Sequence, residues 1–129
     1  SALGLEHAQV FATDDYIVLV DDEAQVAALM PDFARLKGLP KRGIAVTASS
    51  TRFDFISRWF GPNVGVNEDP VTGSAHTSLA PFWAERLGKS LLTAEQGGKR
   101  RGQLRCELKG DRVIISGHAA LYLQGTIYL

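Results

Sequence analysis

The polar chemistry of this sequence is concentrated in the segment NEDPVTGSAH, residues 67–76, which leads into an amphipathic stretch. Gly73 and Ser74 stand where a helix is expected to begin. The first turn of a helix presents backbone N–H groups without intrahelical partners, at the positive end of the helix dipole. A glycine there lets a ligand approach the backbone, and a serine adds a hydroxyl donor. The pattern is typical of a site for a carboxylate or a phosphate.

Asp69 precedes this helix start by four residues, across the rigid Pro70. We expect its carboxylate at the edge of the anion site, where it would accept a hydrogen bond from a ligand or take part in proton transfer. A structural interpretation is also open, in which Thr72 or Ser74 is an N-cap and Asp69-Pro70 is an ordinary turn. The spacing alone does not decide between these interpretations.

The remaining reactive side chains allow fewer functions. His76 either contacts a ligand or is structural. A Ser-His-Asp hydrolase is excluded, because the G-x-S-x-G pattern is absent and neighbours this close on a helix do not face each other. His7, His76 and His118 show no metal-ligand spacing, so no metal site is predicted, and Cys106 fits an inert core thiol. The basic segment 95–104 fits either a contact with an anionic substrate or a solvated surface.

Composition narrows the class of protein. The 129 residues are 45% hydrophobic and 22% charged, and fourteen basic residues balance fourteen acidic ones. This balance provides no field to attract nucleic acid or an anionic membrane, so we expect neither as a partner. A lone cysteine indicates a reducing, cytoplasmic location, and no apolar run approaches the roughly 20 residues that span a bilayer. The N-terminus has no signal-peptide pattern. It also lacks an initiator Met, so we expect a processed protein or a fragment.

Hydrophobic periodicity predicts one α+β domain over residues 1–129, with antiparallel strands wrapped about one main helix. That helix is expected over 74–88, with Gly88 as its end, and Pro81 is expected to kink it or to leave one carbonyl unpaired. Short helices are expected at 21–30, with Asp22 as N-cap, and at 31–36. A type II′ turn at Gly110-Asp111 would join two strands of the C-terminal third. The predicted strands are 8–12, 15–21, 43–49, 52–60, 103–109, 112–116 and 119–129.

The run EDPVTGSAH, followed by LAPFWAERLGK, resembles the phenazine-biosynthesis PhzF-like family of isomerases and epimerases. The upstream runs IAVTASS and FDFISRWFGPNVGVN, and the later Gln, Arg-Gly and Gly-x-Ala positions, extend the resemblance over nearly the whole chain. The resemblance implies half of a diaminopimelate-epimerase-like fold, in which each half has a barrel-like antiparallel or mixed sheet around a central helix. It further implies an active site in the cleft between the halves, and proton transfer at carbon without cofactor or metal.

The resemblance also assigns residues by motif match. Asp69 and His76 are expected as catalytic residues, with Asp69 in the position of the cleft aspartate. Substrate binding is expected from Thr72, Gly73, Ser74 and Ala75 at the start of the helix, which would hold a small carboxylate-bearing metabolite. The chain departs from the family pattern at Thr77, at His118 and in the basic loop 96–103, and these departures leave the substrate open.

Only the C-terminal half of longer family members resembles this chain, and the catalytic glutamate of the family lies in the N-terminal half. Three hypotheses follow. The chain is the C-terminal domain of a PhzF-like isomerase whose partner is the missing N-terminal half. Alternatively, it is a stand-alone half-domain that associates with a second copy of itself and binds small carboxylates. In the third hypothesis it is a scaffold without catalytic function.

Overall fold

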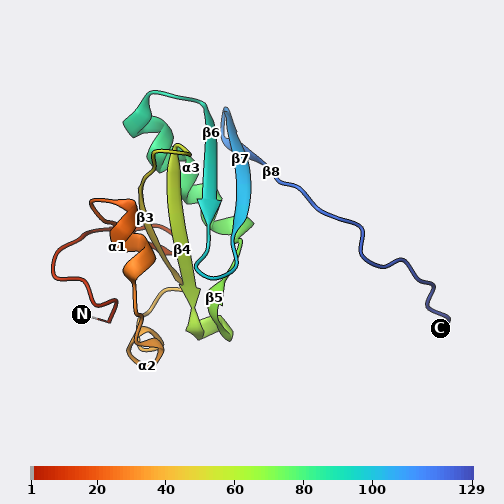
Figure 1. The fold of residues 1–129 in the computed structure, drawn as a ribbon, viewed down its shortest axis with the longest axis horizontal. Helices are drawn as coiled ribbons and strands as arrows, with labels where there is room; N and C mark the ends of the chain where they lie inside the picture. Colours follow the sequence, from red (N-terminus) through yellow and green to blue (C-terminus); the bar gives the residue numbers. More distant parts are fainter. Residues whose placement is uncertain (1) are drawn as a thin grey trace.

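A mixed, open sheet of eight strands forms the centre of the computed structural model, which describes residues 2–129 (Figure 1). The strand order is β1-β2-β3-β4-β6-β7-β8, and β5 pairs with β4 beside this path. The pairs β2–β3 and β4–β6 are parallel, and the others are antiparallel. The strands are β1 (Gln9–Ala12), β2 (Tyr16–Leu19), β3 (Ile44–Ser49), β4 (Phe55–Gly61), β5 (Val66–Asp69), β6 (Leu91–Gln96), β7 (Gly102–Lys109) and β8 (Arg112–Ser116).

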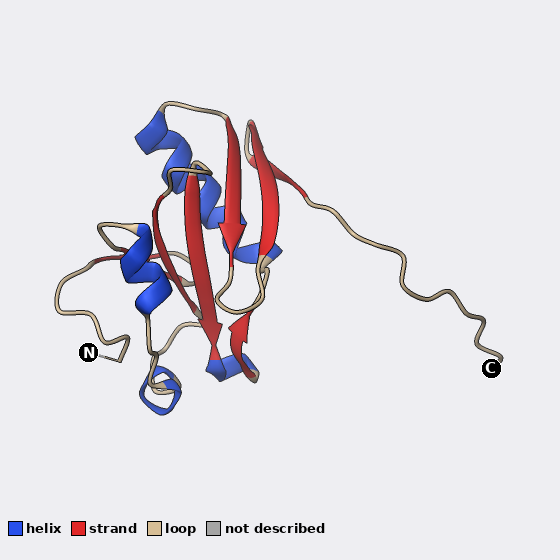
Figure 2. Cartoon of the chain, in the orientation of Figure 1, coloured by secondary structure: helices blue, strands red, loops and turns tan. Residues whose placement is uncertain are grey.

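The α+β class is confirmed, but the sheet is open, with β1 and β8 at its two ends. Helix α3 (Gly73–Leu87) packs on one face of the sheet through a core that includes Phe55, Leu79 and Trp83. The short helices α1 (Glu23–Ala28) and α2 (Phe33–Leu36) pack on the opposite face through a second core (Figure 2). Successive side chains of a strand point to opposite faces, so the central strands contribute to both cores.

Strand β4 differs from the half-buried strand predicted over 52–60. It begins at Phe55, and all of its residues except Ile56 are buried. The physical reason is that α1 covers the face that the sequence pattern assigned to solvent. Arg58 is only 9% exposed, and its guanidinium binds the Glu68 carboxylate at 2.7 and 2.9 Å. The same guanidinium donates to the carbonyl of Leu29, 3.0 Å away, at the C-terminal end of α1.

Local signals for the helix ends are largely confirmed. Asp22 is the N-cap of α1, and its side chain accepts a hydrogen bond from the Gln25 N–H at 2.8 Å. Helix α2 starts after Asp32, which caps it, and not at Pro31 as expected. Helix α3 continues through Pro81 and ends at Gly88, which adopts the left-handed conformation with φ of 63°. A single turn of 3₁₀ helix, η1 (Pro62–Val64), joins β4 to β5.

The C-terminal hairpin matches its prediction, but the last expected strand is absent. Gly110 has φ of +59° and lies between the paired residues Lys109 and Arg112. Residues 117–129 instead form an extended tail without secondary structure (Figure 1). In the described part of the chain these residues meet no neighbouring strand, and a strand needs one to satisfy its backbone hydrogen bonds. No helix within residues 2–129 has the length and apolar character that crossing a membrane requires.

Candidate functional site

Two strands end beside the same stretch of β4, and α3 begins at this point. In the sheet, Asp69 at the end of β5 pairs with Trp59, and Gln96 at the end of β6 pairs with Ser57. The Gln96 amide Nε2 donates to the Asp69 carbonyl and to the Thr72 hydroxyl, each at 2.9 Å. The loop that leads into α3 is therefore anchored to the ends of two strands.

Asp69 is partly buried, and its carboxylate turns toward the helix start. Its Oδ2 accepts a hydrogen bond from the Thr72 hydroxyl at 2.8 Å, and its Oδ1 lies 3.4 Å from the Val71 N–H. Thr72 occupies the N-cap position of α3, but within residues 2–129 no side chain caps the helix at that position. The structural interpretation from the sequence is thus half right. Thr72 occupies the N-cap position, but its side chain makes no capping hydrogen bond to the helix.

The first turn of α3 is open to solvent on one side. Gly73 and Ser74 are exposed, whereas Ala75 is buried in the core. A Cβ placed on Gly73 would meet no atom within 4 Å among the described residues. A 15-residue helix has four N–H groups without intrahelical partners at its start, so this open turn can receive an anion.

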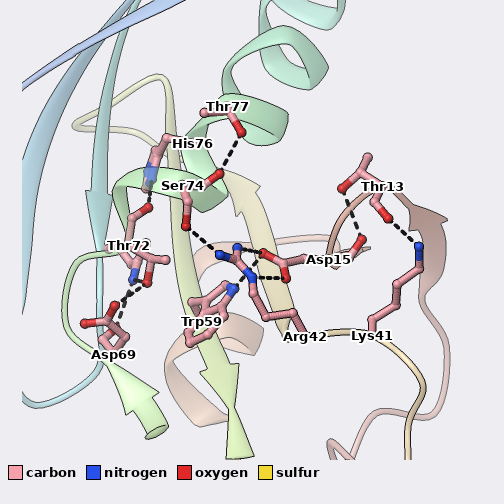
Figure 3. A network of polar contacts seen from close by, with 11 residues as sticks. Thr13, Asp15, Lys41, Arg42, Trp59, Asp69, Thr72, Ser74, His76 and Thr77 are labelled. Atoms are coloured by element: carbon pink, nitrogen blue, oxygen red, sulfur yellow. Dashed lines mark hydrogen bonds and ion pairs between the residues drawn. The ribbon is translucent and has the colours of Figure 1, made fainter. Parts of the chain in front are cut away.

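Arg42 joins this helix start to a buried carboxylate (Figure 3). Its Nη1 donates to the Ser74 hydroxyl at 2.9 Å, and its Nε and Nη2 donate to Asp15 at 3.0 and 2.6 Å. Asp15 also accepts from the indole Nε1 of Trp59 at 2.9 Å. Burial acts to raise the pKa of Asp15, but the hydrogen bonds from Arg42 and Trp59 and the charge of Arg42 outweigh it, so the pKa is lowered.

The sequence reasoning missed both Asp15 and Arg42. Asp15 precedes β2, and Arg42 precedes β3, and the parallel pairing of these strands brings the two residues together. They are 27 residues apart in the chain, and no motif connects them with Ser74. Only the sheet topology, which the sequence does not give, would have identified them.

His76 lies behind the helix start. It is fully buried, its ring lies 5.8 Å from the ring of Phe55, and its Nδ1 is 2.8 Å from the Thr72 carbonyl. A carbonyl oxygen only accepts hydrogen bonds, so Nδ1 carries the proton. Burial lowers the pKa of His76, and the hydrogen bond to Thr72 offsets this only in part. The catalytic role expected for His76 remains a prediction. The His76 side chain is buried and does not reach the exposed first turn of α3.

A layer of polar atoms lies beneath the loop. Ser57 Oγ, His76 Nε2 and Gln96 Oε1 are buried without a hydrogen-bond partner in the part of the chain that the structure describes. Buried polar atoms are nearly always paired, and those that are not call for an explanation such as a functional role. Ser57 and Gln96 are neighbours in the sheet, and both Gln96 and His76 bind Thr72. Through their other side-chain nitrogens, His76 and Gln96 thus hold Thr72, the N-cap residue of α3.

An open pocket of about 600 Å³ adjoins the same helix start. The basic loop contributes Arg101, whose guanidinium binds the Glu95 carboxylate at 3.1 Å, while Lys99 and Arg100 are exposed. The loop packs closely, because a Cβ on Gly97 would lie 2.9 Å from the Pro70 carbonyl. The lining residues are Val71, Gly73, Glu95, Arg101–Leu104 and Ile115–His118.

The described residues give less support to metal binding and to thiol chemistry. Among residues 2–129, no three His, Cys, Asp or Glu side chains come together in a way that would hold a metal ion. Cys106 is buried in the core under α3, and burial raises the pKa of its thiol to about 11. A thiol in that state is not a nucleophile at neutral pH.

The comparisons with known proteins agree with one another. The family model of the phenazine biosynthesis-like proteins matches residues 5–125. An uncharacterized isomerase of Pseudomonas aeruginosa is 72% identical over 128 residues, which are 99% of this chain and 49% of that protein. An uncharacterized isomerase of Halalkalibacterium halodurans is 47% identical, over 89% of this chain and 44% of that protein.

The solved structures give the same result. The crystal structure of a phenazine biosynthesis protein of the PhzF family from Enterococcus faecalis matches with a TM-score of 0.92 and 45% identity. The match covers 99% of this chain and 50% of that one, so this chain spans about half the length of the relatives it matches. With the family model over residues 5–125 and these relatives together, the chain belongs to the PhzC-PhzF family of phenazine biosynthesis-like proteins.

Proposed function

We propose that this chain is the C-terminal half of a cofactor-independent isomerase that moves a proton on a small carboxylate-bearing substrate. The observation that carries the proposal is the exposed, uncapped first turn of α3, where Gly73 leaves the backbone open and Ser74 adds a hydroxyl. In this proposal the chain supplies one wall of the active-site cleft. The finer fold it implies is a diaminopimelate-epimerase-like half with α3 as its central helix.

A carboxylate is the favoured ligand group because the features of this turn attract an anion. The free N–H groups and the helix dipole are positive there, and the exposed Ser74 adds a hydroxyl donor. The chain as a whole has no net charge, so this attraction is local. The substrate-binding residues of the proposal are Thr72, Gly73, Ser74 and Ala75.

Asp69 is the group of this chain that we propose for proton transfer. Its carboxylate is partly exposed, and its bond to the Thr72 hydroxyl fixes its orientation beside the helix start. By family resemblance the base is a glutamate of the other half, so this half alone is expected to lack activity. We assign the buried His76 a supporting role, because its Nδ1–H holds the Thr72 carbonyl at the first turn of α3.

The partner in this proposal is the other half of the protein. The tail is the feature that supports it, since Leu121, Leu123 and Ile127 are 80% or more exposed. The Enterococcus faecalis structure matches over 99% of this chain, which includes nearly all of the tail, and that chain is twice as long. The contacts that would cover an apolar tail are thus expected from the half that this chain lacks, or from a second copy.

Ligand binding is tested by titrating the ¹⁵N-labelled chain with L-malate, L-lactate and L-glutamate. We expect the amide signals of Gly73, Ser74 and Ala75 to move. Gly73→Ala should weaken binding without unfolding the chain, because the added methyl group points into open space at the ligand site. Gly125→Ala, in the tail and equally unhindered, is the matched control. If no carboxylate moves the amides of the α3 start, the proposed function is wrong.

Catalysis is tested by mixing. One half of the Pseudomonas aeruginosa isomerase matches this chain with 72% identity. The other, unmatched half of that isomerase is the complement to mix with this chain. We expect the two halves to form a 1:1 complex in sedimentation equilibrium. The complex should catalyse exchange of a carbon-bound proton of a bound carboxylate with deuterium from the solvent. Asp69→Asn should abolish the exchange and leave the complex intact. A stable dimer of this chain that does not bind the complement would favour the hypothesis of a self-associating half-domain instead.

A further inference from the structure

The Ser74 hydroxyl is held by a guanidinium whose own position is fixed from behind. Asp15 binds Arg42 through two N–H groups, at 3.0 and 2.6 Å, and its side chain is only 4% exposed. The Arg42 guanidinium also lies 5.3 Å from the centre of the Trp59 ring, and Trp59 in turn donates to Asp15. Figure 3 shows Arg42 between Asp15 and Ser74, with Trp59 beside it.

The direction of the hydrogen bond determines what Ser74 can do. A guanidinium has donors and no acceptor, so the Ser74 oxygen accepts from Arg42 Nη1. The hydroxyl proton of Ser74 must then point away from Arg42. Because Ser74 is exposed in the first turn of α3, that proton is available to an anion at the helix start. Without Arg42 the Ser74 hydroxyl rotates freely, and its oxygen can also accept a hydrogen bond from a ligand.

We propose that Arg42 is a positioning residue that makes the Ser74 hydroxyl a hydrogen-bond donor to the substrate carboxylate. The inference rests on the proposed function, because it concerns the ligand of the same helix start. It adds a specificity rule. The site should favour groups that only accept hydrogen bonds there, such as a carboxylate, over the corresponding amides.

Two other roles for Arg42 predict different results. If Arg42 acted only as a positive charge near the ligand, lysine would replace it. Lysine is a point charge and cannot bind Asp15 with two parallel N–H groups while it also reaches Ser74. If Arg42 only stabilised the fold by neutralising Asp15, its loss would lower stability and leave ligand affinity unchanged.

The experiment is a double-mutant cycle on L-malate binding, with the Kd read from the Gly73 and Ser74 amides. Ser74→Ala should weaken binding about ten-fold, the typical effect of losing a hydrogen bond to a charged group. Arg42→Gln and Arg42→Lys should weaken binding by a similar factor. In the Ser74→Ala background, Arg42→Gln should change the Kd by less than about two-fold, since the hydroxyl through which Arg42 acts is gone.

A variant that fails to fold does not block the test. Arg42→Gln leaves the buried Asp15 carboxylate without its counter-charge, so the double variant Asp15→Asn/Arg42→Gln removes both charges at once and should show the same loss of affinity. Additive losses in the cycle, or full affinity in Arg42→Lys, would overturn the inference alone. Binding of succinamide as tight as that of succinate would contradict the proposed anion site as well. A wild-type chain that binds no carboxylate would overturn the proposed function together with it.

Discussion

Lowering the pH below neutrality should destabilise this chain because His76 is buried in its neutral form. The His76 side chain is fully buried, its Nδ1–H is bound to the Thr72 carbonyl, and burial lowers its pKa below the ordinary value of 6.5. In the unfolded chain the same imidazole takes up a proton as the pH falls through 6.5. The unfolded state then binds more protons than the folded state, so stability is full above this pH and is lost below it.

The size of the effect follows from the unfolded pKa. Between pH 7.5 and 5.5, protonation of one unfolded imidazole lowers the free energy of unfolding by up to about 1.4 kcal/mol. Carboxylates contribute little in this interval, because their ordinary pKa values are about 4. The free energy of unfolding is measured by urea denaturation at pH 7.5, 6.5 and 5.5, with the fluorescence of the buried Trp59 and Trp83 as the signal.

The matched variant is His76→Gln, whose amide can still donate to the Thr72 carbonyl but does not titrate. We expect it to be less stable than the wild type at pH 7.5 and to show little pH dependence. His118→Gln changes an exposed histidine and should keep the wild-type dependence. A wild-type stability that is constant from pH 7.5 to 5.5, or an unchanged slope in His76→Gln, would refute the reasoning.

Three further outcomes follow from packing and burial. Gly43→Ala should cost about 1–3 kcal/mol of stability in urea denaturation, because its Cβ would lie 2.3 Å from the Trp59 ring, whereas Gly73→Ala should leave stability unchanged. Arg58→Met should cost about 3 kcal/mol in the same assay, since it leaves a carboxylate and the end of α1 without their donor, and a neutral result would contradict that role. Cys106, with a pKa of about 11 and no exposure, should resist iodoacetamide at pH 8 until urea unfolds the chain; rapid labelling of the folded chain would contradict its burial.

The features that the sequence predicted correctly depend on local interactions. The Asp22 cap involves residues three positions apart, and the Gly88 end of α3 depends on the conformation that glycine permits. The alternation of Leu104 and Cys106 with polar residues placed β7 correctly, with both side chains in the core. The two helix signals involve residues that are close in the chain, and the alternation in β7 follows from the two-residue period of a strand, so the local pattern contains the information.

The features that the sequence did not predict depend on partners from elsewhere. Nothing in the alternation of residues 52–60 indicates that α1 covers the second face of β4 and that Arg58 is consequently buried. The tail 119–129 has the composition of a strand but has no neighbouring strand among the described residues. Within the site, Ser74 was found by its motif, whereas Arg42 was not, because Arg42 lies 32 positions away in the chain and no spacing rule connects the two.

The helix start and the tail bear on the proposed enzyme in opposite ways. The helix start is held from within this chain, by Gln96 from β6, by Arg42 from the loop before β3, and by the pairing of Asp69 with Trp59. The carboxylate site should therefore exist before the other half arrives. The tail, by contrast, makes no such contacts with the rest of residues 2–129 and leaves its apolar side chains exposed. Binding of a carboxylate and assembly of the cleft are then separable, and a tail truncation should abolish assembly with the complement while it leaves carboxylate affinity unchanged.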